Sequence, residues 1–333
     1  MNLQKRTIVS KPACLILFIL FLLCGQNSAS GKGVFPSDKE DSCLEASYLP
    51  IADPYVMLYE GRYYAYGTGG TTEGEGFACF SSNNLKDWTR EEQALFAKDS
   101  YGKWGFWAPE VYYIESKKKF YMFYSVEEHI CVATSDSPTG PFKQEIKEPI
   151  WKEKSIDSSL FIDDDGTPYL YFVRFTDGNV VWVAEMTDDL MAIRTETLTQ
   201  CIKADKPWEL LQAKVTEGPS VLKKNGIYFL IYSANHYQNK GYGVGYATSD
   251  SPMGPWIKSG GNPLLQSIPE LGLFGTGHGA PFQCIDGSWK YIFHAHWSKD
   301  KVHPRTSFFK GFRISDQGVI SISGDVIKPR VLK

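Results

Sequence analysis

Acidic side chains stand at the head of short apolar segments at several widely separated places in the chain. Asp53, Glu110, Asp157 and Glu217 each lead into such a segment, and His278 stands in the same setting with an imidazole instead of a carboxyl group. Carboxyl groups that face one another at short range repel, which raises their pKa values. A pocket that gathers them can hold a protonated acid beside an ionised base, the two groups that acid–base catalysis requires.

Each of these residues is followed by the same order of sequence features. After Glu217 come a short apolar run, a Lys-Lys-Asn-Gly turn and an aromatic, β-branched run over residues 227–233, an order typical of a β-hairpin. The other four positions are followed in the same way. Self-similarity at intervals of roughly 40–60 residues, with several short strands per unit, is typical of propeller blades. The sequence therefore predicts an all-β, five-bladed β-propeller.

Two outer segments support the repeat independently. Residues 132–142 and 246–256 are near copies that share Ala-Thr-Ser-Asp-Ser-Pro and a Gly-Pro-aromatic ending. In a propeller the innermost strand of every blade borders the central channel, so residues at the start of those strands converge near the axis. We therefore expect the five leading residues to occupy equivalent positions and to meet at one end of the channel.

The length and charge of the chain limit the classes of function. Five blades at the observed spacing use nearly all of the 333 residues, so residues 48–333 are predicted to form one propeller domain. A formal net charge of −3 offers no basic surface that would neutralise phosphates. Nucleic acid is therefore not an expected partner.

The first 30 residues have the features of a signal peptide. Basic residues precede an apolar run over residues 14–23 that is too short to span a membrane. Two endings are open: cleavage after Ser30, or lipid attachment at Cys24 as in a lipoprotein. Either ending predicts an exported protein that is secreted, periplasmic or anchored to a membrane through Cys24 alone. Residues 31–47, which are poor in apolar side chains, are predicted to be a tether.

The cysteines do not indicate a disulfide framework or a metal site. Seven are present, and five remain after the export segment is set aside. An odd, widely spaced set lacks the regular spacing of a disulfide-rich scaffold and has no Cys-x-x-Cys pair. We expect small buried apolar groups, with at most a pair or two bridged.

Four motifs resemble the blade motifs of glycoside hydrolase family 43, over a stretch from about residue 48 to the C-terminus. They are Ala52-Asp53-Pro54, Trp107-Ala108-Pro109-Glu110, Asp157-Ser158-Ser159-Leu160-Phe161 and Thr216-Glu217-Gly218-Pro219. The resemblance implies a five-bladed propeller that hydrolyses glycosidic bonds with inversion. It also implies that Asp53 is the general base acting on water, that Glu217 is the general acid, and that Asp157 tunes and orients the acid.

Three further positions follow from the same comparison and from side-chain chemistry. His278 resembles the axial histidine of the family, which supports a water-coordinated calcium ion; a structural histidine without metal is the alternative. Arg305 resembles an arginine that binds the sugar. Trp107 lies in an aromatic loop whose rings are candidates for sugar stacking, the alternative being that they fill the core between blades. Glu110 is expected to form hydrogen bonds near the axis without a chemical role.

The leading prediction is an exported, exo-acting glycosidase that removes L-arabinofuranosyl or D-xylosyl units from plant polysaccharides or oligosaccharides. Two alternatives remain open at this point. One is an endo-arabinanase or galactan-cleaving enzyme on the same fold, because pocket depth depends on loops. The other is a propeller that binds carbohydrate without catalysis, which the presence of all three carboxylates disfavours.

Overall fold

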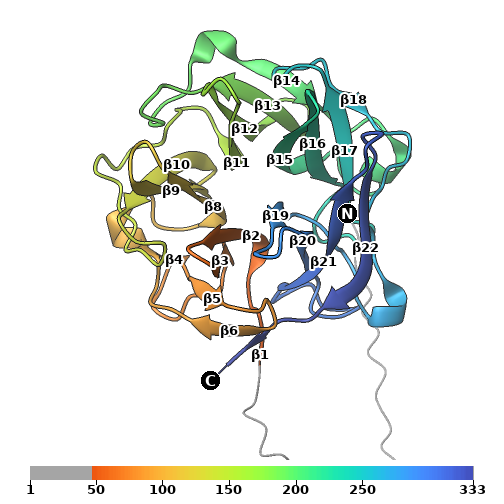
Figure 1. Cartoon of the computed structure of the whole chain (residues 1–333), viewed down its shortest axis with the longest axis horizontal. Helices are drawn as coiled ribbons and strands as arrows, with labels where there is room; N and C mark the ends of the chain where they lie inside the picture. Colours follow the sequence, from red (N-terminus) through yellow and green to blue (C-terminus); the bar gives the residue numbers. More distant parts are fainter. Residues whose placement is uncertain (1–46, 333) are drawn as a thin grey trace, which may run out of the picture. The chain divides into compact units, whose positions relative to one another are not determined.

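The computed structural model describes residues 47–332, in which five β-sheets are arranged radially around a central axis (Figure 1). The prediction of an all-β, five-bladed propeller is confirmed. The signal peptide predicted over residues 1–30, with Cys24, and all but the last residue of the predicted tether lie outside the described residues. Within the described part, no helix is long and apolar enough to cross a membrane.

The strands of each blade follow one another from the axis outward. Blade 1 contains β2 (Ala52–Tyr59), β3 (Arg62–Thr68), β5 (Phe80–Ser82) and β6 (Asp87–Arg90). Blade 2 contains β8 (Trp107–Ile114), β9 (Lys119–Val126) and β10 (His129–Ser135). Blade 3 contains β11 (Ser155–Ile162), β12 (Pro168–Phe175), β13 (Asn179–Glu185) and β14 (Thr199–Ile202). Blade 4 contains β15 (Thr216–Lys224), β16 (Ile227–Ala234), β17 (Gly243–Ser249) and β18 (Ile257–Lys258). Blade 5 contains β19 (Pro281–Gln283), β20 (Trp289–Ala295), β21 (Thr306–Ile314) and β22 (Ile320–Ile327).

The remaining elements are short and peripheral. A separate two-stranded sheet joins β4 (Gly76–Phe77) to β7 (Leu95–Phe96). The helical segments of the described chain are single 3₁₀ turns, namely η1 (Ala97–Asp99), η2 (Thr195–Thr197), η3 (Pro207–Glu209) and η4 (Pro269–Leu271).

The ring is closed at blade 1 by both ends of the described chain. Strand β23 (Arg330–Val331) pairs in parallel with β6, and β1 (Ser47–Tyr48) pairs with β23. On the inner side, the Ser307 N–H donates to the Leu49 carbonyl oxygen over 3.1 Å. These pairings satisfy backbone groups that an edge strand would otherwise expose.

Aromatic side chains fill the spaces between neighbouring blades. Trp88 of blade 1 stacks on Phe309 of blade 5, with ring centroids 6.0 Å apart. Phe106 packs edge-on against Phe77 in the cluster between blades 1 and 2, so for this loop residue the core alternative holds. The four described cysteines are unbridged and three of them are buried, as expected of small apolar groups.

The two near-copy segments occupy the same place in blades 2 and 4. Each follows the third strand of its blade and accepts a hydrogen bond from a tyrosine of the preceding blade: Tyr66 donates to the Pro138 carbonyl, and Tyr171 to the Pro252 carbonyl. The repeated sequence therefore marks a repeated contact between blades.

The inner strands of blades 1 to 4 each have a β-bulge near their start that sets the direction of their first side chains. Pairing with the next strand is interrupted in blades 1 to 4, between residues 52 and 55, 107 and 110, 156 and 159, and 217 and 220. In all five blades the second residue of this segment has a left-handed backbone; these are Asp53, Ala108, Asp157, Gly218 and His278, with φ between 39° and 56°.

Because of the bulges, the five leading residues do not all occupy the equivalent positions that the sequence predicts. Asp53, Asp157 and His278 do share one position. Glu217 lies one residue before it and Glu110 two residues after it, so the prediction is wrong for these two. An alignment on polar residues alone cannot place the extra residue of a bulge.

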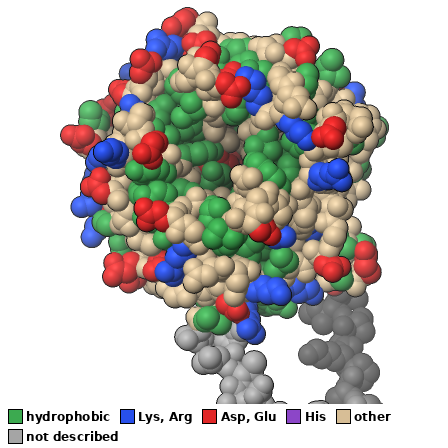
Figure 2. All heavy atoms as spheres, viewed as in Figure 1, with side chains coloured by type: hydrophobic (Ala, Val, Ile, Leu, Met, Phe, Trp, Pro, Cys, Tyr) green, Lys and Arg blue, Asp and Glu red, His purple; other side chains and the backbone are tan. Residues whose placement is uncertain are grey.

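Hydrophobic side chains surround a central depression on the face of the propeller shown in Figure 2. The inner strands thus leave space around the axis, and that space contains the candidate site.

Candidate active site

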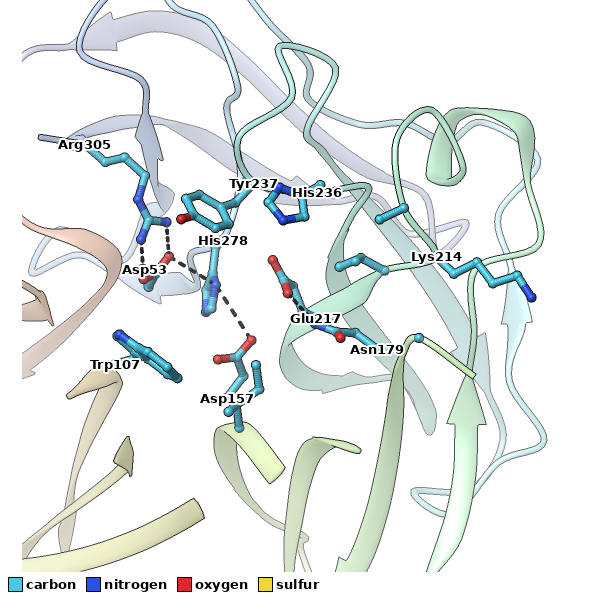
Figure 3. A pocket seen from close by; sticks show the side chains of 14 residues that line it. Asp53, Trp107, Asp157, Asn179, Lys214, Glu217, His236, Tyr237, His278 and Arg305 are labelled. Carbon is cyan, nitrogen blue, oxygen red and sulfur yellow. Dashed lines mark hydrogen bonds and ion pairs between the residues drawn. The ribbon is translucent and has the colours of Figure 1, made fainter. Parts of the chain in front are cut away.

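A cavity of about 460 Å³ lies at the end of the axis where the inner strands begin. Side chains from all five blades border it (Figure 3). Among them are all six residues selected from the sequence, namely Asp53, Trp107, Asp157, Glu217, His278 and Arg305. The structure therefore brings these six residues together.

The bulges direct carboxylates toward the axis at a cost in backbone strain. Asp53 and Asp157 have φ values of 47° and 56°. A residue other than glycine in this region costs on the order of 1–3 kcal/mol. In blade 4 a Cβ at Gly218 would lie 2.7 Å from Cδ2 of His278, so no side chain fits there. The carboxyl group of that blade is instead supplied by the preceding residue, Glu217.

Asp53 is buried and held in the ionised form. Arg305 donates to both of its carboxylate oxygens, Nη1 to Oδ1 over 2.6 Å and Nη2 to Oδ2 over 3.1 Å. Thr68 donates to Oδ2 over 2.7 Å. Burial alone would raise the pKa of Asp53, but Arg305, His278 and His294 together hold it well below its usual value. The group is therefore a carboxylate at any pH at which the protein would work.

His294 supports Asp53 from behind. It is fully buried, and its Nδ1 accepts a hydrogen bond from the Asp53 N–H over 3.1 Å. Its ring stacks on Tyr242 with centroids 5.7 Å apart. Burial, and then the charge of Arg305, lower the pKa of His294 to about 3, so the imidazole is neutral.

The surroundings of Glu217 favour its protonated form, in contrast to those of Asp53. Burial and, to a smaller extent, the charge of Asp53 raise its pKa, two hydrogen bonds lower it, and the net result is a pKa of about 7. In those bonds Tyr242 donates to Oε1 over 2.8 Å and Asn179 donates to Oε2 over 2.9 Å. Glu217 thus retains a proton over a large part of the range near neutral pH and is fixed in orientation.

Asp157 is coupled to Glu217. Burial raises its pKa well above the usual value, and the charges of Glu217 and Asp53 raise it further. Its Oδ2 accepts a hydrogen bond from the Gly218 N–H over 3.2 Å and lies 3.9 Å from Nδ1 of His278. Asp53 is therefore the one ionised member of the three carboxyl groups, and protons are retained on the Asp157–Glu217 pair.

Glu110 does not border the larger cavity. It borders a separate cavity of about 10 Å³, together with Asp53, Asp157 and His278. Tyr112 donates a hydrogen bond to it, and burial raises its pKa to about 7. Glu110 thus meets Asp53 and Asp157 at the small cavity but does not share the larger cavity with Glu217, because the bulge carries it two residues past the equivalent position.

Several residues of the site carried no distinctive sequence signal. Asn179 begins an outer strand, and Tyr242 lies in the loop before β17, far from any repeated motif. Tyr237 borders the pocket, with its ring 4.6 Å from Cζ of Arg305. His294 was visible only as a neighbour of Arg305 in sequence. These side chains act through contacts between blades, which spacing along the chain does not reveal.

Comparisons with known proteins agree with this geometry. The model of the family described as glycosyl hydrolases family 43 matches residues 49–319. The β-D-galactofuranosidase xynD of Aspergillus niger is 28% identical over 296 residues, covering 82% of this chain and 78% of that protein. A β-xylosidase of Xylanibacter ruminicola is 27% identical over 316 residues, covering 79% of this chain and 89% of that protein.

A solved structure extends the comparison to three dimensions. The crystal structure described as an endo-1,4-β-xylanase from Bacteroides thetaiotaomicron superposes with a TM-score of 0.87 and 77% sequence identity. The match covers 87% of this chain and 100% of that one.

Proposed function

Because the chain belongs to family 43 of the glycosyl hydrolases, which act on glycosidic bonds, we propose that it is an inverting, exo-acting enzyme that removes L-arabinofuranosyl or D-xylosyl units from plant polysaccharides or oligosaccharides. The observation that carries the proposal is the opposite setting of two carboxyl groups in one pocket. Asp53 is kept ionised by Arg305, whereas Glu217 keeps its proton up to a pKa of about 7. An inverting glycosidase requires this pair.

The proposed reaction uses each group in one step. Asp53 accepts a proton from a water molecule, whose oxygen forms a bond to the anomeric carbon. The bond from that carbon to the leaving oxygen breaks, and Glu217 donates its proton to this oxygen. Tyr242 and Asn179 hold the acid in place and stabilise the carboxylate that remains. Asp157, beside Glu217, positions the sugar and adjusts the acid. One water molecule is consumed, and the proton exchanges with solvent between turnovers.

Exo action is supported by the size of the pocket. At about 460 Å³ it lies toward the small end of ligand pockets and suits a terminal sugar better than a run of subsites. A second candidate, endo action on β-1,4-xylan, is favoured by the name of the similar structure at 77% identity. The products from linear oligosaccharides separate the two, because exo action releases monosaccharide from the first turnovers and endo action releases internal fragments.

Calcium at the axis is part of the proposal. The small cavity is bordered by His278, Glu110 and Asp157, and the buried Ser158 hydroxyl has no hydrogen-bond partner among the described residues. Nowhere in residues 47–332 do three or more His, Cys, Asp or Glu side chains group as a metal site, so most ligands of the ion would be water. At about 10 Å³ the cavity has room for about one water molecule, so the bordering side chains would have to move apart to admit the hydrated ion. His278 would hold this hydrated ion, which would supply positive charge at the floor of the pocket.

We also propose that the protein is exported, on the strength of residues 1–30 alone. The mass of the mature protein after expression in a bacterial host decides between cleavage after Ser30 and a lipid on Cys24. A protein that retains its initial residues in the cytoplasm would contradict export.

The first experiment is hydrolysis of aryl α-L-arabinofuranoside, β-D-xyloside and β-D-galactoside, with xylan and arabinan alongside. We expect one pentoside to be cleaved, the first-formed sugar to have the inverted anomeric configuration by NMR, and a chelator to lower the rate if calcium is bound. Asp53→Asn and Glu217→Gln should each lower kcat/KM by about 10²–10⁴-fold. Unchanged turnover in Glu217→Gln would show that Glu217 is not the general acid.

A further inference from the structure

Trp104 presents an indole ring to solvent beside Trp107, which borders the active-site pocket. Its exposed fraction is 57%, the largest of any tryptophan in the described residues. Single exposed apolar side chains are common on protein surfaces, so the position of this ring, rather than its exposure, points to a ligand.

The loop that carries Trp104 is held in place by hydrogen bonds and close packing. The Trp104 carbonyl accepts a hydrogen bond from the Glu127 N–H over 3.2 Å, and the Lys103 N–H donates to Oε1 of Glu127 over 2.8 Å. On one side of Trp104, Gly102 has a φ of 74° and no room for a side chain, because a Cβ would lie 2.6 Å from Cγ2 of Val126. The backbone on which the ring is mounted is therefore held in one conformation.

The ring lies next to a second tryptophan that borders the reaction site. Its centroid lies 6.5 Å from that of Trp107, at an interplanar angle of 74°, and Trp107 borders the pocket that contains Asp53 and Asp157. Phe106, between the two tryptophans in sequence, is buried in the core. The loop therefore places three aromatic rings in three settings, namely the core, the pocket and the solvent beside the pocket.

We propose that Trp104 is the platform of an outer sugar-binding subsite, beyond the sugar unit that the carboxylates act on. A sugar ring stacks its C–H groups on an aromatic face without any need for charge. Lys103 and Glu127 hold the loop through main-chain contacts and leave the indole free of a charged partner among the described residues. The inference rests on the proposed glycosidase function and adds that the preferred substrate is an oligosaccharide or polysaccharide longer than a disaccharide.

The test is the dependence of kcat/KM on substrate length. β-1,4-Xylo-oligosaccharides and α-1,5-arabino-oligosaccharides of two to five units are compared between the wild-type enzyme and Trp104→Ala. We expect the ratio of kcat/KM for the longest to the shortest substrate to fall about 3–10-fold in the variant. Trp104→Phe, which keeps a smaller ring, should restore part of the loss. Trp297→Ala is the matched control, because Trp297 is 47% exposed and its ring contacts Tyr48, which does not border the pocket, whereas the ring of Trp104 contacts Trp107, which does.

The outcomes separate the subsite from the proposed function. An unchanged length ratio in Trp104→Ala, or an equal fall in Trp297→Ala, would overturn the subsite while hydrolysis by the wild-type enzyme stands. If the wild-type enzyme cleaves neither these series nor the aryl pentosides and polysaccharides, the proposed pentosidase function fails. The subsite is then decided by calorimetric titration with the pentamers, in which weaker binding by Trp104→Ala than by Trp297→Ala supports it and equal binding refutes it.

Discussion

At the scale of single residues, the site keeps two similar acids in opposite states. Asp53 and Glu217 are both buried, yet only Asp53 has a cation in bidentate contact. Glu217 receives neutral donors, Tyr242 and Asn179, which offset only part of the desolvation that raises its pKa. The neighbouring side chains, rather than the type of acidic residue, therefore decide which carboxyl group serves as base and which as acid.

Tyr242 should control the alkaline limit of activity. Its hydroxyl stabilises the charged form of Glu217 and so lowers the pKa of that group. In Tyr242→Phe the pKa of Glu217 should rise, so the alkaline limb of the kcat/KM profile should move to higher pH while the maximum falls about tenfold through poorer orientation.

The control is Tyr171→Phe, which loses a hydrogen bond to the Pro252 carbonyl away from the pocket. It should leave the position of the limb unchanged. A limb that stays in place in Tyr242→Phe would mean that the tyrosine acts only in packing.

At the scale of elements, the bulge near the start of the inner strands of blades 1 to 4 is the device that builds the site. It turns Asp53 and Asp157 toward the axis, and in blade 4 it brings the Gly218 N–H against Asp157. The glycine at this position also makes room for the His278 ring.

Gly218→Ala tests this device. We expect a loss of more than about 1 kcal/mol of stability and a large loss of kcat/KM, because the added methyl group must displace His278. Gly226→Ala is the control, since Gly226 also has a left-handed backbone, with φ of 79°, but has nothing within 4 Å of the new Cβ. It should lose about 1 kcal/mol in urea unfolding and keep its activity. Equal activities in the two variants would refute the steric account.

Sequence reasoning reached the elements more fully than the contacts between them. The five hairpins, their order and the two near-copy segments follow from turn residues and alternating aromatic runs, which are local signals. The six candidate residues could be chosen because they stand at the start of inner strands or in family motifs. The offset of Glu110 and Glu217 depends on bulges, and the partners Asn179, Tyr242 and His294 depend on packing between blades. Neither the bulges nor the packing between blades can be recognised from the local sequence.

At the scale of the whole molecule, the site should lower the stability of the fold. The pKa of Glu217 is raised to about 7 in the folded state, whereas in the unfolded chain the group ionises near its ordinary value of 4.5. The folded state therefore binds more protons, and stability falls as pH rises from about 4.5 to about 7 and stays low above it. The depressed pKa of Asp53 acts in a separate window, because its contribution is lost only as pH falls through that low value.

Glu217→Gln should therefore be inactive but more stable. The gain in the free energy of unfolding should be on the order of 1–3 kcal/mol at pH 8 and much smaller at pH 4.5. It would be measured as a rise in the midpoint temperature of thermal unfolding. Glu145→Gln, at an exposed position, is the control and should show no such difference. A variant that is no more stable than wild type at pH 8 would contradict the buried, protonated state of Glu217.

The closure of the ring has a consequence for how activity arises. Every blade supplies part of the pocket wall, and β23, which follows blade 5, pairs with the first blade. No set of consecutive blades short of all five holds the complete pocket. Catalysis should thus return after denaturation only when blade 5 has joined blade 1, so the recovery of activity measures the closure of the ring.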